Sequence, residues 1–254
     1  MTSQLDSRCV LLRSLHVPGT PLVLPNAWDA ASARAVAAAG FPVVATTSGG
    51  VSDALGYEDR QGAPVGEMLA AAARIGRSVE VPLTVDAEAG YGLGPAELVA
   101  ALREAGAAGC NLEDTNHASG ALRDPGEHAE WLRSVRAAAS AADYGLVINA
   151  RIDVFLAAER GAPQAGLVPE AVRRARAYLE AGVDCVYPIA LREAAAVGAF
   201  VSEAGGAVNI LALPQAPSVA ELAELGVARI SYGSLLYRNT MEQFAGSLAG
   251  VPRG

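Results

Sequence analysis

The chain has 254 residues, 52% of them apolar and 18% charged, which is enough to build one large hydrophobic core. Its net charge of −8, without a basic stripe, argues against nucleic acid as a partner. Three widely spaced cysteines argue against a disulfide framework and indicate a reducing compartment. All 19 basic residues are arginine, so chemistry that needs a lysine Schiff base is excluded.

The sequence shows no pattern for export or membrane insertion. The first residues lack the basic-then-apolar order of a signal peptide. No apolar run approaches the roughly 20 residues that a membrane span needs. We therefore expect a cytoplasmic protein with no membrane partner. The densest basic cluster, Arg173, Arg174 and Arg176, is expected to form the solvated face of a helix.

Short strand-like runs alternate with helix-like runs along the chain. Most of the strand-like runs are continuously apolar, which is typical of parallel strands buried on both faces. The predicted strands are Leu22–Asn26, Val43–Thr47, Leu83–Glu88, Cys110–Asp114, Leu146–Ile152, Cys185–Ile189, Val208–Leu213 and Arg229–Gly233. The clearest helices have apolar positions spaced near 3.6 residues. They are Pro64–Val79, Pro95–Ala105, Glu127–Ala142, Pro169–Ala181, Arg192–Glu203 and Ser218–Leu225.

This alternation predicts the fold. Eight strand–helix units in about 250 residues match the dimensions of a (β/α)₈ barrel. The alternative is an open doubly wound sheet, which requires a phosphate-binding fingerprint after its first strand. Leu24–Asp29 is not such a fingerprint. Because no linker or change of composition divides the chain, we predict one barrel domain over residues 1–254.

Acidic residues follow two neighbouring predicted strands. Asp86 and Glu88 are two positions apart and so point to the same side, and Glu113 ends the next strand. The active site of such a barrel lies at the carboxyl ends of its strands. Carboxylate oxygens are ligands that Mg²⁺ prefers, and like charges this close need neutralising. We predict a metal site at these three residues; the alternative is that they cap loops or pair with arginines.

An arginine lies inside an otherwise apolar strand, at Arg151. If it points inward, its guanidinium suits the bidentate capture of a substrate carboxylate. The alternative is a structural pair with Asp153 or Glu113, and one arginine can serve both purposes. After the second strand, the small residues 47–50 predict a turn whose backbone N–H groups could form an oxyanion cradle, although such turns are common.

Three further polar residues are candidates for the site. Asp59 lies in the long connection after the second strand, a place where lids occur, and is otherwise a solvated loop acid. His117 follows the fourth strand and is either an acid–base group or a solvated loop histidine. Asn209, in the seventh strand, is a candidate for contact with a substrate.

Taken together and in this order, several segments resemble the isocitrate lyase/phosphoenolpyruvate mutase superfamily. The resemblance extends from about residue 20 to about residue 235, and its segments are Pro25–Asp29, Thr47–Gly49, Asp86–Gly92, Leu112–Asp114 and Ala150–Asp153. It implies a (β/α)₈ barrel, Mg²⁺ with Mn²⁺ as the alternative ion, and an α-oxo acid or its enolate as the bound species. It also implies a C-terminal helix swapped between subunits, in a homodimer or a homotetramer.

The resemblance implies a role for each site residue at its matching position. Asp86 would bind the metal directly, and Glu88 and Glu113 would hold it through water. Arg151 would bind the substrate carboxylate, and Asp59 would be the acidic residue near the reacting end. The predicted substrate-binding residues are Thr47, Ser48, Gly49, Asp86, Arg151 and Asn209, and the predicted catalytic residues are Asp59, His117 and Arg151.

The chain departs from two patterns of this superfamily. The lyases carry a Lys-Cys-Gly-His lid after the fourth strand, but residues 116–122 contain no cysteine here. The mutases carry a histidine after the sixth strand, where this chain has Tyr187 and Pro188. We therefore predict a Mg²⁺-dependent lyase or hydrolase that cleaves or forms a C–C bond in a small 2-oxo or 2-hydroxy (di)carboxylate through an enolate. The alternatives are a P–C enzyme of the mutase or phosphonopyruvate hydrolase type, and a non-catalytic binder of 2-oxo acids such as 2-oxoglutarate or oxaloacetate.

Overall fold

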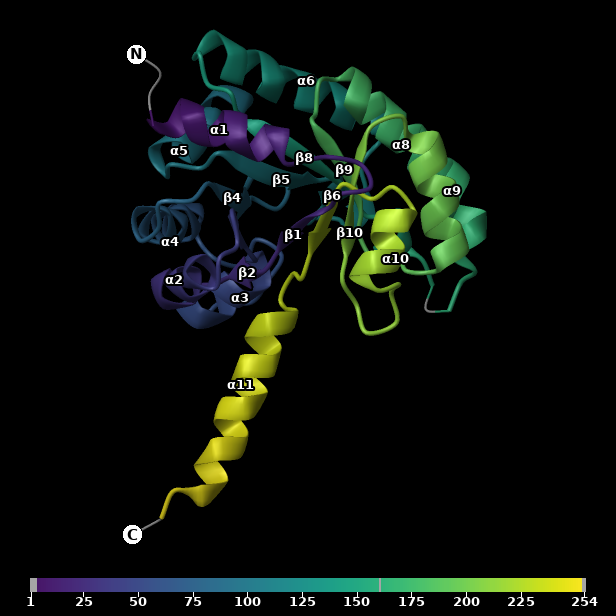
Figure 1. The fold of residues 1–254 in the computed structure, drawn as a ribbon. Helices are drawn as coiled ribbons and strands as arrows, with labels where there is room; N and C mark the ends of the chain where they lie inside the picture. The colour runs from purple at the N-terminus through teal and green to yellow at the C-terminus, as the bar shows by residue number, and fades with distance from the viewer. Residues whose placement is uncertain (1–3, 160, 253–254) are drawn as a thin grey trace.

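A computed structural model describes residues 4–159 and 161–252, and nine of their strands form one parallel sheet (Figure 1). The order across the sheet is β1 (Leu22–Leu24), β11 (Arg229–Ser231), β10 (Ala207–Leu211), β9 (Cys185–Pro188), β8 (Val147–Ile152), β5 (Gly109–Glu113), β4 (Leu83–Asp86), β3 (Val44–Thr46) and β2 (Asn26–Ala27).

The sheet closes into a barrel. β1 and β2 are consecutive parts of one segment, separated by Pro25, which has no N–H to donate to the sheet. β1 pairs with β11, and β2 pairs with β3, so this segment joins the two edges. The segment together with the other seven strands gives the eight-stranded barrel, which confirms the predicted fold class.

Helices surround the barrel between the strands (Figure 1). All eight strands and all six helices predicted above are present, with bounds shifted by a few residues. Ser218 and Glu221 form a capping box at the start of the helix that begins at Val219. The helices are α1 (Gln4–Ser14), α2 (Ala30–Ala38), α3 (Ser48–Leu55), α4 (Val65–Arg77), α5 (Pro95–Glu104), α6 (Pro125–Ala141), α7 (Val154–Ala157), α8 (Val168–Glu180), α9 (Ala194–Ala204), α10 (Val219–Glu224) and α11 (Leu235–Ser247).

Two local structures differ from the sequence-based expectation. The predicted turn at residues 47–50 is instead the first turn of α3, with Thr47 as its N-cap. Gly50 is needed there because a Cβ atom would lie 2.8 Å from the Thr47 side chain and 3.2 Å from Trp28. The loop after β5 is a short antiparallel hairpin of β6 (Thr115–Asn116) and β7 (Ala121–Leu122).

The last long helix, α11, projects away from the barrel (Figure 1). Only Tyr237 is buried along it, whereas Met241 and Phe244 are 43% and 57% exposed. Large apolar side chains on a projecting helix indicate a surface that another element covers. Within the described part of the chain, no helix combines the length and the apolar character needed to cross a membrane.

The core contains a buried histidine that should make the fold sensitive to acid. His128 packs against Trp131 and Tyr178, and neither ring nitrogen has a hydrogen-bond partner among the described residues. Burial, with help from the charges of Arg123 and Arg174, lowers its pKa from 6.5 to about 3. The unfolded chain therefore binds a proton below pH 6.5 that the folded chain rejects, so stability is complete above 6.5 and falls as the pH decreases toward 3.

We expect His128→Phe to remove this loss, because phenylalanine fills the same aromatic position without titrating. Between pH 6.5 and pH 4, the free energy of unfolding of the variant should fall by about 3 kcal/mol less than that of the wild type. Urea denaturation across this pH range is the measurement. Parallel pH curves for the two proteins would contradict the assignment.

Candidate active site

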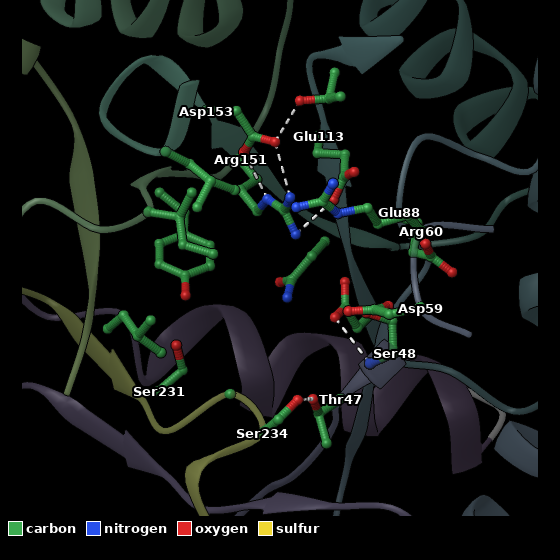
Figure 2. Close-up of a pocket in the computed structure, with 18 of the residues that line it drawn as sticks. Thr47, Ser48, Asp59, Arg60, Glu88, Glu113, Arg151, Asp153, Ser231 and Ser234 are labelled. Atoms are coloured by element: carbon green, nitrogen blue, oxygen red, sulfur yellow. Dashed lines mark hydrogen bonds and ion pairs between the residues drawn. The ribbon is translucent and has the colours of Figure 1, made fainter. Parts of the chain in front are cut away.

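A cavity of about 550 Å³ opens at the carboxyl ends of the barrel strands. One part of its wall carries Arg151 next to Glu113 and Asp153, and Ser48 and Asp59 lie together at another part (Figure 2). The strands therefore bring the predicted acids and the predicted arginine to one place. All three predicted catalytic residues, Asp59, His117 and Arg151, line this cavity.

Two of the predicted metal-binding acids lie at the carboxyl end of β4, Asp86 as its last residue and Glu88 just after it. Asp86 Oδ2 accepts a hydrogen bond from the Ser48 backbone N–H at 3.0 Å, whereas Oδ1 is buried without a partner among the described residues. Glu88 is only 3% exposed and accepts a hydrogen bond from the Gln61 backbone N–H at 2.6 Å. Burial, with the negative charges of Asp86 and Asp59, raises the pKa of Glu88 to about 8. Neither carboxyl group forms an ion pair with a described residue, although Arg60 also lines the cavity.

Arg151 binds two carboxylates at once. The structural pairing with Asp153 or Glu113, given above as one of two alternatives, is therefore formed. Its Nη1 lies 2.5 Å from Glu113 Oε2, and its Nε and Nη2 donate to the two oxygens of Asp153 at 2.6 and 2.8 Å. Thr115 Oγ1 also donates to Asp153 at 2.5 Å. The guanidinium is thus locked in one orientation on the cavity wall.

Behind Arg151 and its two carboxylates lies a buried ion pair that the sequence did not reveal. Asp114 is fully buried and accepts hydrogen bonds from the Asp153 backbone N–H, from Arg174 Nη1 and from Tyr178 Oη, at 2.9, 2.9 and 2.7 Å. The prediction of a solvated arginine face on α8 was therefore wrong for Arg174, which is 5% exposed. Its spacing from the buried residues Ala171 and Tyr178 was the signal that could have placed it inward.

The two loop candidates reach the cavity from different connections. Asp59 lies directly against Gly49, where an added Cβ would be 2.9 Å from Asp59 Oδ2 and from Ser234 Oγ. The β6–β7 hairpin holds His117 so that its Nε2 is 2.6 Å from Glu113 Oε1. This contact is an ion pair when the ring is charged. The contact with Glu113 raises the pKa of His117.

Two predicted substrate-binding residues, Gly49 and Asn209, do not line the cavity, and Gly49 lies against the lining residues Asp59 and Ser234. Asn209 is fully buried, does not line the cavity, and directs its Nδ2 to Ser231 Oγ at 3.4 Å. Other lining residues carried no recognisable sequence signal, because distant elements bring them together. They include the aliphatic residues Leu156, Ile189, Leu211 and Leu213 and the arginines Arg60 and Arg238.

The acidic side of the cavity fits a hard divalent cation. No three histidine, cysteine, aspartate or glutamate side chains within residues 4–159 and 161–252 are placed so that all could bind one metal ion. Mg²⁺ typically takes one or two carboxylates and keeps several waters, so it does not require such a cluster. The unpartnered Asp86 Oδ1 and the raised pKa of Glu88 are what a missing positive charge would produce.

Comparison with known proteins gives the family. Residues 12–251 match the phosphoenolpyruvate phosphomutase family model, and the chain belongs to the isocitrate lyase/phosphoenolpyruvate mutase superfamily. It is 31% identical to 2-methylisocitrate lyase of Escherichia coli K12 over 232 residues, which cover 84% of this chain and 72% of that enzyme.

Two solved structures show the same fold. A candidate phosphonomutase from Burkholderia cenocepacia J2315 is 41% identical, with a TM-score of 0.91 over 96% of this chain and 98% of that one. An oxaloacetate acetylhydrolase in complex with its product oxalate has a TM-score of 0.83 over 97% of this chain and 90% of that one. At 23% identity, this second likeness shows the fold alone.

The buried pair behind the site should be essential for stability. We expect Arg174→Met to lower the free energy of unfolding by about 3–5 kcal/mol, because it leaves Asp114 charged and uncompensated in the interior. Arg173→Met is the matched control, since the Arg173 side chain is 59% exposed and its pair with Glu170 should contribute at most about 1 kcal/mol. Urea denaturation at pH 7 checks both, and equal losses would contradict the assignment.

Proposed function

We propose that the protein is a Mg²⁺-dependent enzyme that cleaves or forms a C–C bond in a small 2-oxo or 2-hydroxy (di)carboxylate through an enolate. The observation that carries this proposal is one cavity lined by Asp86, Glu88 and Glu113 together with the clamped Arg151. The acids can bind a divalent cation, and the arginine beside them can bind a carboxylate. A 2-oxo acid can contact both, because it chelates the cation and carries a carboxylate.

The chain's own residues bind the two charged partners. Asp86 would hold the ion directly, with Glu88 and Glu113 holding it through water. When bound, Mg²⁺ supplies electrophilic stabilisation of the charge that develops on the α-oxo oxygen. Arg151 has five N–H donors, of which Glu113 and Asp153 take three, so two remain for the substrate carboxylate.

Asp59 and His117 are the residues we assign to proton transfer. Cleavage of a 2-hydroxy acid needs a base that takes the hydroxyl proton and an acid that protonates the enolate carbon. Asp59 lies beside Gly49 with its carboxylate toward the cavity, which suits the base. The contact with Glu113 raises the pKa of His117 and so favours its protonated form, which suits the acid. The lid that lacks a cysteine, residues 116–122, contains this histidine.

A second candidate function is P–C bond chemistry on phosphonopyruvate. It is favoured by the match to the phosphoenolpyruvate phosphomutase family and by the 41% identity to the candidate phosphonomutase. The buried Tyr187, at the place where the mutases carry a histidine, argues against it. ³¹P NMR of phosphonopyruvate incubated with the protein and Mg²⁺ distinguishes the two, since only the P–C enzyme changes the phosphorus signal.

The decisive experiment is calorimetric titration with 2-oxo acids, with and without Mg²⁺, followed by NMR of the mixtures. We expect Mg²⁺-dependent binding and new product signals. Asp59→Asn should retain binding and lose at least about 100-fold in turnover, the scale of a lost acid–base group. Binding without products for any tested acid would favour a non-catalytic binder, and absence of binding by the wild type would contradict the proposal.

We also propose a homodimer or homotetramer in which α11 packs on a second copy. Phe244 and Met241 are exposed along this projecting helix, and burying them would remove a large apolar area from water. Light scattering should show a multimer for the wild type and a smaller mass for the double variant Met241→Asp/Phe244→Asp. Glu242→Gln, on the same exposed helix, should leave the mass unchanged. A monomeric wild type would contradict this assembly.

A further inference from the structure

The floor of the cavity carries an asparagine that none of the roles above uses. Asn111 lies on β5, two residues before Glu113, and pairs in register with Asp86 of β4 and Asn149 of β8. Its side chain is among those that line the cavity, although the residue is only 8% exposed. It therefore lies between the acids that fit the cation and the polar interior of the barrel.

Two residues of the barrel interior, Arg229 and Asn149, fix the orientation of the Asn111 amide. Arg229 Nη2 lies 3.1 Å from one amide atom of Asn111, and Asn149 Nδ2 lies 2.8 Å from the same atom. Arginine has only donors, so this atom must be the Asn111 carbonyl oxygen. Both of its lone pairs are used, and the amide cannot rotate without facing its NH₂ group toward a guanidinium.

The amide nitrogen of Asn111, Nδ2, is therefore available to donate a hydrogen bond. No residue within 4–159 and 161–252 accepts a hydrogen bond from it, and the neighbouring Asp86 takes its own hydrogen bond from the Ser48 backbone. Nδ2 is also absent from the buried side-chain atoms that lack a partner, so protein atoms do not seal it. A free donor on a cavity-lining side chain is available to a molecule that binds in the cavity.

Arg229 makes this donor stronger. The residue is 1% exposed, forms no ion pair with any described carboxylate, and leaves Nε and Nη1 unpartnered within the described chain. A guanidinium held unpaired in the interior is costly, which argues that its position has a use. Its positive charge at the oxygen end polarises the Asn111 amide, so the N–H end becomes a better donor to a negative oxygen.

We propose that Asn111 is a substrate-binding residue whose Nδ2–H donates to a carboxylate or enolate oxygen of the bound acid, and that Arg229 is the residue that positions it. This inference rests on the proposed function, which supplies the class of ligand. Asn111 would thus be a neutral donor on the floor of the cavity, in addition to the charged donor Arg151 on its wall. We expect the substrate oxygen that Asn111 binds to be negatively charged.

Asn111→Asp tests the donor with little change of shape. The new carboxylate keeps the contact with Arg229 and gives it a counter-ion, so the melting temperature should equal or exceed that of the wild type. The face toward the cavity changes from donor to acceptor. Affinity for oxalate with saturating Mg²⁺, measured by calorimetry, should fall at least about tenfold.

Asn111→Ala separates loss of the donor from the added charge. It should lose affinity for oxalate to a similar extent, although its melting temperature should be lower. Wild-type affinity in Asn111→Ala would overturn the proposal, because the effect of Asn111→Asp would then be charge repulsion. A wild type that binds no oxo acid would instead overturn the proposed function, and this inference with it.

The role of Arg229 requires a double-mutant cycle. Methionine replaces a buried arginine at similar volume, so Arg229→Met should remain folded. If Arg229 acts through Asn111, Arg229→Met should weaken oxalate binding severalfold in the wild-type background and leave it unchanged in the Asn111→Ala background. Equal losses in both backgrounds would show a general structural role and would overturn the positioning role.

Discussion

The site depends on the clamp that Glu113 and Asp153 form around Arg151. Three charges of alternating sign share one side of the cavity, and each partner removes part of the desolvation cost of the others. Asp114 connects this clamp to an outer helix, because it accepts a hydrogen bond from the backbone N–H of Asp153 and pairs with Arg174 of α8. The orientation of the cavity arginine is therefore supported by an outer helix as well as by the barrel strands.

On the other side of the cavity, Asp86 and Glu88 form no ion pair with any described arginine. Asp86 has an unpartnered oxygen among the described contacts, and the pKa of Glu88 is raised by burial and by neighbouring carboxylates. The same barrel holds Arg229 deep in its interior without a carboxylate partner among the described residues. The barrel therefore holds carboxyl groups at Asp86 and Glu88 and positive charge at Arg229, and Asn111 lies between them. An amide dipole placed there aligns its oxygen with the guanidinium and its NH₂ group with the cavity.

Sequence patterns predicted the strands because parallel strands buried on both faces must be continuously apolar. They also located Asp86, Glu113 and Arg151, since polar residues within or at the ends of such strands are costly unless they are used. They failed at residues 47–50, where tight packing against Trp28 lets a glycine-rich segment begin a helix. They also failed at Arg174, which is charged like its neighbours and differs only in the direction it faces.

The barrel, the family and the acids and arginine of the site could be predicted from the sequence, because each depends on local periodicity or on a short motif. Which polar residues meet depends on the tertiary structure. It brought Asp59 against Gly49, withdrew Asn209 from the cavity, and joined Arg229 to Asn111 across 118 positions of the chain. The physical reason is that a hydrogen bond depends on the direction of each side chain across the closed barrel, and no local pattern records that direction.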